Sequence, residues 1–119
     1  MQYLVTDQEE TRQQVLAAMS EAEGLGEVRT VASPEKLREL LEPEVTSCIL
    51  VDEALEGRIA LPIIQELSRT YPLIPVVLLS RARTSESVVA AMDAGARTVL
   101  ALPLSLEEIS NRLLPVLAG

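Results

Sequence analysis

Side chains able to bind ions or phosphate stand at or just beyond the ends of three apolar runs of this chain. Asp52 follows the run 48–51, Ser80 follows the run 76–79, and Asp7 comes two residues after the run 3–5. A continuous apolar run of this length is typical of a strand buried on both faces of a parallel sheet. Open sheets of that kind place their chemistry at the carboxyl ends of their strands. The pattern therefore predicts a phosphate, metal or other ligand site around Asp52.

The elements that position these residues alternate between strands and helices. Strand-like runs occur at 3–5, 28–31, 48–51, 76–79 and 98–101, and helical patterns at 9–22, 33–41, 59–70, 85–94 and 105–117. Ser33 before Pro34 marks a helix start, Gly95 marks a helix end, and Ser105 with Glu108 predicts a capping box. Alternation of this kind requires right-handed crossovers, so we predict an α/β domain with five βα units and a doubly wound parallel sheet.

Composition limits the class of protein. The 119 residues predict a single domain, 1–119, either alone or as the N-terminal part of a longer protein. Ten basic against eighteen acidic residues disfavour nucleic-acid binding, and the absence of histidine excludes histidine-based catalysis and zinc ligation. The single Cys48 excludes an internal disulfide. The chain has no apolar stretch long enough to predict a membrane span. The single thiol within an apolar run favours a cytoplasmic setting. Because histidine, a nucleophile elbow and a metal cluster are all missing, we expect a protein that is not an enzyme.

Three stretches give the chain a family resemblance. The segments Ile74–Ser80, Ala94–Ala96 and Leu102–Glu108, together with Asp7 and Asp52, resemble the receiver domain of two-component response regulators over essentially the whole chain. This resemblance implies a three-layer (βα)5 flavodoxin-like fold with strand order 2-1-3-4-5 and a signalling function in a phosphorelay. It also implies a cis peptide bond before Pro103.

The resemblance assigns roles to individual residues. Asp52 matches the phosphoacceptor, which receives its phosphoryl group from a histidine kinase or a phosphotransfer protein. Asp7, Asp52 and the backbone carbonyl of Ala54 match the ligands of Mg²⁺, and Ser80 matches the hydroxyl that senses the phosphoryl group. A carboxylate is a competent nucleophile when a metal ion neutralises the phosphoryl oxygens.

The chain departs from the receiver pattern at its switch positions. Leu102 replaces the family's lysine, Val99 replaces the aromatic switch residue, and Thr6 replaces one of two acidic residues after the first strand. A charge-assisted hydrogen bond contributes about 1.5–3 kcal/mol, whereas a full two-state switch takes about 5.5 kcal/mol. The loss of the lysine therefore removes a large share of the switching energy. Arg81, or Arg83 beyond it, is a candidate compensating charge near Asp52.

Several alternatives stay open on sequence alone. Asp7 with Glu10 equally predicts a capping box, Ser80 equally predicts a partner for a strand-end backbone group, and Arg81 and Arg83 equally predict solvated loop charges. The alternative function is a phosphorylation-independent pseudo-receiver that serves as a docking or dimerisation module, for example like the N-terminal domain of the pilus-assembly localisation ATPases. The weakly charged fourth helix predicts a homodimer through helix 4, strand 5 and helix 5.

Overall fold

Five parallel strands form the central sheet of the computed structural model, which describes residues 1–57 and 59–119. The strands are β1 (Gln2–Val5), β2 (Val28–Val31), β3 (Cys48–Asp52), β4 (Val76–Ser80) and β5 (Thr98–Ala101). Their order is β2-β1-β3-β4-β5, which confirms the predicted fold class and strand order. Because β3 and β4 are neighbours, their last residues, Asp52 and Ser80, meet at the same edge.

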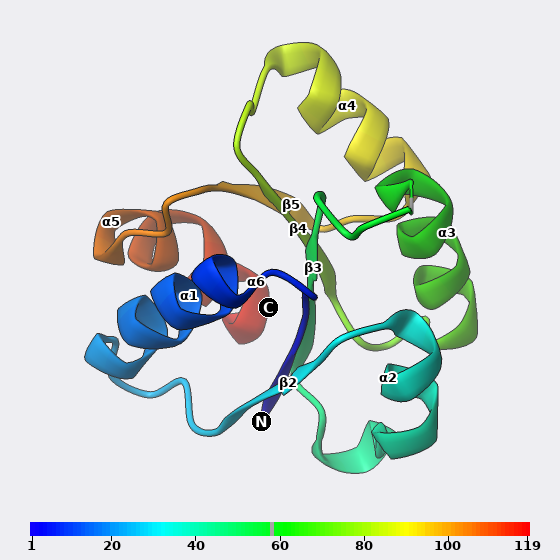
Figure 1. The fold of residues 1–119 in the computed structure, drawn as a ribbon. Coiled ribbons are helices and arrows are strands. Elements are labelled where there is room, and N and C mark those ends of the chain that lie inside the picture. Colours follow the sequence, from blue (N-terminus) through cyan, green and yellow to red (C-terminus); the bar gives the residue numbers. More distant parts are fainter. Residues whose placement is uncertain (58) are drawn as a thin grey trace.

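Helices cover both faces of the sheet (Figure 1). One face carries α1 (Glu9–Glu21), α5 (Leu106–Glu108) and α6 (Leu114–Ala118), and the other carries α2 (Pro34–Leu40), α3 (Ala60–Thr70) and α4 (Ser85–Ala94). A short 3-10 turn, η1 (Pro43–Val45), precedes β3. Among the residues that the structure describes, no helix is both long enough and apolar enough to cross a bilayer.

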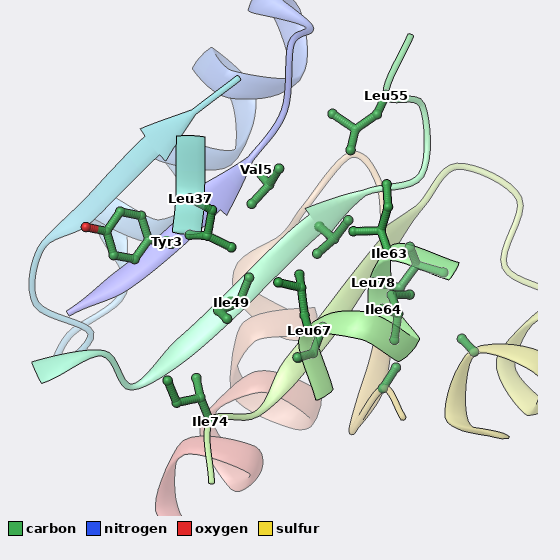
Figure 2. Packing of buried hydrophobic residues seen from close by; sticks show 14 of the residues in the cluster. Tyr3, Val5, Leu37, Ile49, Leu55, Ile63, Ile64, Leu67, Ile74 and Leu78 are labelled. Atoms are coloured by element: carbon green, nitrogen blue, oxygen red, sulfur yellow. The ribbon is translucent and has the colours of Figure 1, made fainter. Parts of the chain in front are cut away.

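Two apolar cores lie on opposite sides of the sheet because successive side chains of a strand point to opposite faces. Tyr3, Val5 and Ile49 pack with Ile64 and Leu67 of α3 (Figure 2). The alternate strand residues pack in the second core with α1 and the C-terminal helices; this core contains Leu4, Cys48, Leu50, Val15, Met19, Ile109 and Leu113. With both faces covered, the carboxyl edge of the sheet is where polar residues gather.

The helix signals are confirmed at two positions. Ser33 accepts a hydrogen bond from the Lys36 amide, with Pro34 at the first position of α2. Gly95 ends α4 at a φ of 121°, in the region of positive φ that favours glycine.

The C-terminal helix differs from the prediction in two respects. The Glu108 amide donates to Ser105, but the Glu108 carboxylate binds the Ala101 amide of β5, so only half of the predicted capping box forms. The expected single helix 105–117 is divided by the π turn η2 (Ile109–Leu113), where the Leu114 amide donates to Ile109. Pro115 has no amide hydrogen, so the regular helical ladder breaks at this point.

Candidate functional site

Asp52 is the central residue of the polar edge. It ends β3 and its side chain is wholly buried. The Thr6 hydroxyl donates to Oδ2 at 2.7 Å, and the Ala54 amide donates to Oδ1 at 2.9 Å. The Arg81 Nη1 atom also donates to Oδ1 at 2.9 Å and forms an ion pair with it. Both carboxylate oxygens of Asp52 are therefore bonded to donors of the chain itself.

The pKa of Asp52 follows from these bonds. Burial alone raises the pKa of the carboxyl, but the hydrogen bonds from Arg81, Ala54 and Thr6 and the charge of Arg81 outweigh it, so the pKa lies below its usual range. The same contact with Asp52 raises the pKa of the Arg81 guanidinium. The pair is ionised at neutral pH.

Arg81 connects three parts of the edge. It follows β4, its guanidinium reaches Asp52 on β3, and its Nη2 atom donates to Thr11 on α1. Its side chain is 42% exposed and therefore remains partly in contact with solvent. Arg81 is therefore not a solvated loop charge, because it is tied to two buried side chains.

Ser80 is held by a residue that the sequence analysis missed. The Ser80 hydroxyl donates to Glu53 Oε1 at 2.9 Å, and the Arg81 amide donates to Glu53 Oε2. Ser80 also accepts from the Ala82 amide at 3.3 Å, as expected of a side chain that satisfies a strand-end backbone group. The available signal was a second acidic residue directly after Asp52, at a position facing the end of β4.

Asp7 does not cap α1, so the predicted capping box with Glu10 is wrong. The position before the helix is Gln8, which forms no side-chain cap. Asp7 is exposed and turns towards the loop after β3, where its Oδ2 atom accepts from the Glu56 amide at 3.0 Å. Its Oδ1 atom accepts from the Gln8 side-chain amide at 2.8 Å, and the same Gln8 nitrogen donates to the Ala54 carbonyl at 3.3 Å.

The arrangement at these oxygens does not fit a Mg²⁺ ion. Mg²⁺ needs near-octahedral oxygen ligands at about 2.0–2.1 Å. The oxygens assigned to it by resemblance, on Asp7, Asp52 and Ala54, already accept hydrogen bonds from side chains and amides, and a guanidinium contacts Asp52. Within residues 1–57 and 59–119, no cluster of three acidic, cysteine or histidine residues is placed to hold a metal ion.

The switch positions lie beside this edge. Val99 is buried in β5, and its carbonyl accepts from Arg83, which also pairs with Glu108. Arg83 is therefore not a solvated loop charge, and its guanidinium pairs with Glu108 rather than with Asp52. Leu102 donates its amide to the Ser80 carbonyl at 2.9 Å, and the peptide bond between Leu102 and Pro103 is cis.

An open cleft of about 560 Å³ lies next to Arg81. It is lined by residues of the first two turns of α1, by Ala54 after β3, and by Leu102 and Pro103 after β5. Arg81 lines this cleft, whereas Asp52 does not.

Comparisons with known proteins agree with one another on the family. A family model described as response regulator receiver domain matches residues 3–114. Proteins described as NtrX-like response regulators of Rickettsia bellii and Rickettsia felis are 30% identical over 108 residues, which cover 89% of this chain and 22% of each relative. The chain thus spans about a fifth of the length of these relatives.

Solved structures share the fold. A response regulator of Chloroflexus aurantiacus aligns with a TM-score of 0.82 at 21% identity, covering 99% of this chain and 97% of its own. A pilus assembly protein of Burkholderia thailandensis aligns with a TM-score of 0.78 at 19% identity, covering 99% and 98%. At these identities the likeness concerns the fold alone.

Proposed function

The chain belongs to the response regulator receiver domain family, and from this membership we propose that it is a phosphorylation-independent receiver that signals through protein docking. Receiver domains are signalling modules of two-component systems, and they interact with histidine kinases or phosphotransfer proteins. The proposal concerns how this particular member works. The N-terminal domain of the pilus-assembly localisation ATPases is one example of such a receiver. The likeness of this chain to a pilus assembly protein supports the shared fold alone.

The observation that carries the proposal is the state of Asp52. An attacking carboxylate oxygen must approach the phosphorus of its donor to about 3–3.5 Å with correct alignment. Asp52 has no exposed surface, and three donors hold its two oxygens. Phosphoryl transfer would require the Arg81 ion pair to open and a charged nucleophile to lose its hydrogen bonds, which opposes the reaction.

The residues around Asp52 support the same proposal. Leu102 brings no charge to the site, and the Ser80 hydroxyl already donates to Glu53 rather than to Asp52. Val99 is small and buried, so it offers no aromatic ring that changes position with the state of the site. Arg81 takes the role of the compensating charge, since it pairs with Asp52 without a phosphoryl group.

The docking surface that we propose is the outer face of α4 with β5 and the C-terminal helices. Val89 and Met92 of α4 are 58% and 51% exposed, and Ala91 is the buried residue of that helix. Exposed apolar side chains on one helix face favour association. We infer a homodimer with two-fold symmetry through this surface. We further infer that the protein is cytoplasmic, and that its domain 1–119 is not an enzyme and binds neither nucleic acid nor membrane.

Intact-mass spectrometry after incubation with acetyl phosphate and Mg²⁺ tests the proposal. We expect no phosphoryl adduct on the wild-type chain and none on Asp52→Asn. An adduct that is present in wild type and absent from Asp52→Asn would overturn the proposal.

Sedimentation equilibrium tests the dimer separately. Val89→Glu and Met92→Glu are expected to give a monomer. Leu73→Glu is a matched control, because Leu73 is 91% exposed but belongs to the turn between α3 and β4 and not to α4. A monomeric wild-type chain, or a dimer that persists in both α4 variants, contradicts the docking surface.

The second candidate function is a working phosphoacceptor at Asp52. The observation that favours it is the placement of Asp52 and Ser80 at the ends of neighbouring central strands, beside an open cleft. The donor would be a histidine kinase or phosphotransfer protein, with Mg²⁺ as the family's cofactor. An Asp52-dependent adduct in the mass experiment is the result that favours this candidate.

A further inference from the structure

The loops after β1 and β3 are joined by side chains at the oxygens where the family pattern places a metal ion. Asp7 Oδ1 and the Ala54 carbonyl share the Gln8 side-chain nitrogen, at 2.8 and 3.3 Å. Asp52 Oδ1 accepts from Arg81 at 2.9 Å. Two nitrogen donors therefore contact all three of these oxygens.

We propose that Arg81 and Gln8 replace a divalent cation in this chain, so that the charge of Asp52 is neutralised and the acidic edge is tied together by the protein itself. This inference rests on the proposed function, because it explains how a receiver is held in one state without metal or phosphate. The expected consequence is a wild-type chain without a Mg²⁺ site and a variant that gains one.

Charge supports the replacement. Asp7 and Asp52 bring two negative charges to the edge, and Glu53 adds a third carboxylate 3.9 Å from Arg81 Nη1. A guanidinium is charged at every accessible pH and is more weakly hydrated than an ammonium group, so it suits a permanent pair with a buried carboxylate. Arg81 is part of the folded chain, so its pair with the wholly buried Asp52 is already formed. A Mg²⁺ ion would have to give up part of its hydration shell each time it bound.

Connectivity supports it as well. A bound cation would tie the loop after β1 to the loop after β3. Here Gln8 makes that link, because its nitrogen bonds to Asp7 on one loop and to Ala54 on the other. Arg81 adds a link from β4 to α1 through Thr11, which a single ion at Asp52 does not provide. The fixed fork of the guanidinium holds both partners at once.

Titration with Mn²⁺, followed by electron paramagnetic resonance of the unbound ion, tests the inference on the full chain. We expect no saturable Mn²⁺ binding by the wild type. Arg81→Met removes the charge and keeps most of the aliphatic stem. Its dissociation constant for Mn²⁺ is expected to be at least about tenfold lower than that of the wild type, a difference of about 1.4 kcal/mol in binding free energy. Adding Asp52→Asn to Arg81→Met is expected to abolish the gained binding.

Thermal unfolding with Mg²⁺ gives a second readout. Ligands that bind only the native state raise its unfolding temperature, so Mg²⁺ is expected to raise that of Arg81→Met and to leave the wild type unchanged. Arg12→Met is the matched control, because Arg12 is similarly exposed but pairs with the exposed Glu9. It is expected to gain no binding. Gln8→Ala leaves the buried ion pair in place, so its gain in affinity for the metal ion is expected to be smaller than that of Arg81→Met. This variant tests the inference if Arg81→Met does not fold.

Two results overturn the inference. One is Mn²⁺ binding by the wild type as tight as that of Arg81→Met. The other is the absence of any gain in Gln8→Ala and in folded Arg81→Met. Either result, with no phosphoryl adduct on Asp52, rejects the replacement of the cation and leaves the phosphorylation-independent function standing. An Asp52-dependent adduct rejects that function whatever the Mn²⁺ titration shows.

Discussion

The ion pair between Arg81 and Asp52 is expected to contribute measurably to stability. Removing one partner of a buried pair costs about 3–5 kcal/mol, but Arg81 is 42% exposed and solvent screens part of its charge. Asp52 also keeps its hydrogen bonds to Thr6 and Ala54 when Arg81 is lost. We therefore expect Arg81→Met to cost about as much as one charge-assisted hydrogen bond, about 1.5–3 kcal/mol.

A double-mutant cycle measured by urea and thermal unfolding at neutral pH isolates this contribution. An unfolding entropy of about 2.1 cal/mol/K per residue over 119 residues converts each kcal/mol into about 4 °C, so Arg81→Met should lower the unfolding temperature by about 6–12 °C. Combining it with Asp52→Asn removes both charges. We expect a coupling energy of about 1.5 kcal/mol between the two positions.

The control for the cycle is another partly exposed arginine. Arg12 has a side chain that is 39% exposed, and its partner Glu9 is 64% exposed, so solvent screens that pair on both sides. We expect no measurable change in Arg12→Met. A coupling energy between positions 81 and 52 within about 0.5 kcal/mol of zero, which is the range of independent sites, would refute the view that Arg81 neutralises Asp52.

Three further measurements follow from the packing and the pKa shifts. A Cβ at Gly95, where φ is +121°, would lie 2.7 Å from the Ser68 Cβ. Gly95→Ala should therefore lower the free energy of unfolding, measured in urea, by about 2–4 kcal/mol. Gly26→Ala is the control, because φ is also positive there but the space is open, and an equal loss in this variant contradicts the prediction. Burial raises the pKa of Cys48 to about 12, so Ellman's reagent should label it only as fast as the chain unfolds, and rapid labelling of the native chain contradicts this. The pKa of Asp52 is lowered in the native state. The contribution of its ionised carboxylate to the free energy of unfolding is therefore complete at a pH above the unfolded pKa of about 3.9, and it is lost as the pH falls through the native pKa. The stability gap between wild type and Asp52→Asn should therefore narrow in acid, and a constant gap contradicts it.

The sequence by itself determined the fold and the strand that carries Asp52. Apolar runs alternating with helical patterns are local features, and in a chain of 119 residues they lead to a parallel sheet covered on both faces. Local helix signals were reliable where the partners lie within one turn, as at Ser33 with the Lys36 amide. They were unreliable where a distant group competes, as at Glu108, whose carboxylate binds a strand amide and Arg83 instead of the predicted cap.

Only the tertiary structure decided what the polar residues do. The Asp52 carboxylate bonds to Thr6, 46 residues away, and to Arg81, 29 residues away. Asp7 leaves its expected cap for an amide 49 residues along the chain. The sequence showed that an arginine was available near Ser80, but no local pattern distinguishes a solvated arginine from one paired with a buried carboxylate. That choice depends on the distances and the burial set by three adjacent strands, which exist only once the sheet has formed.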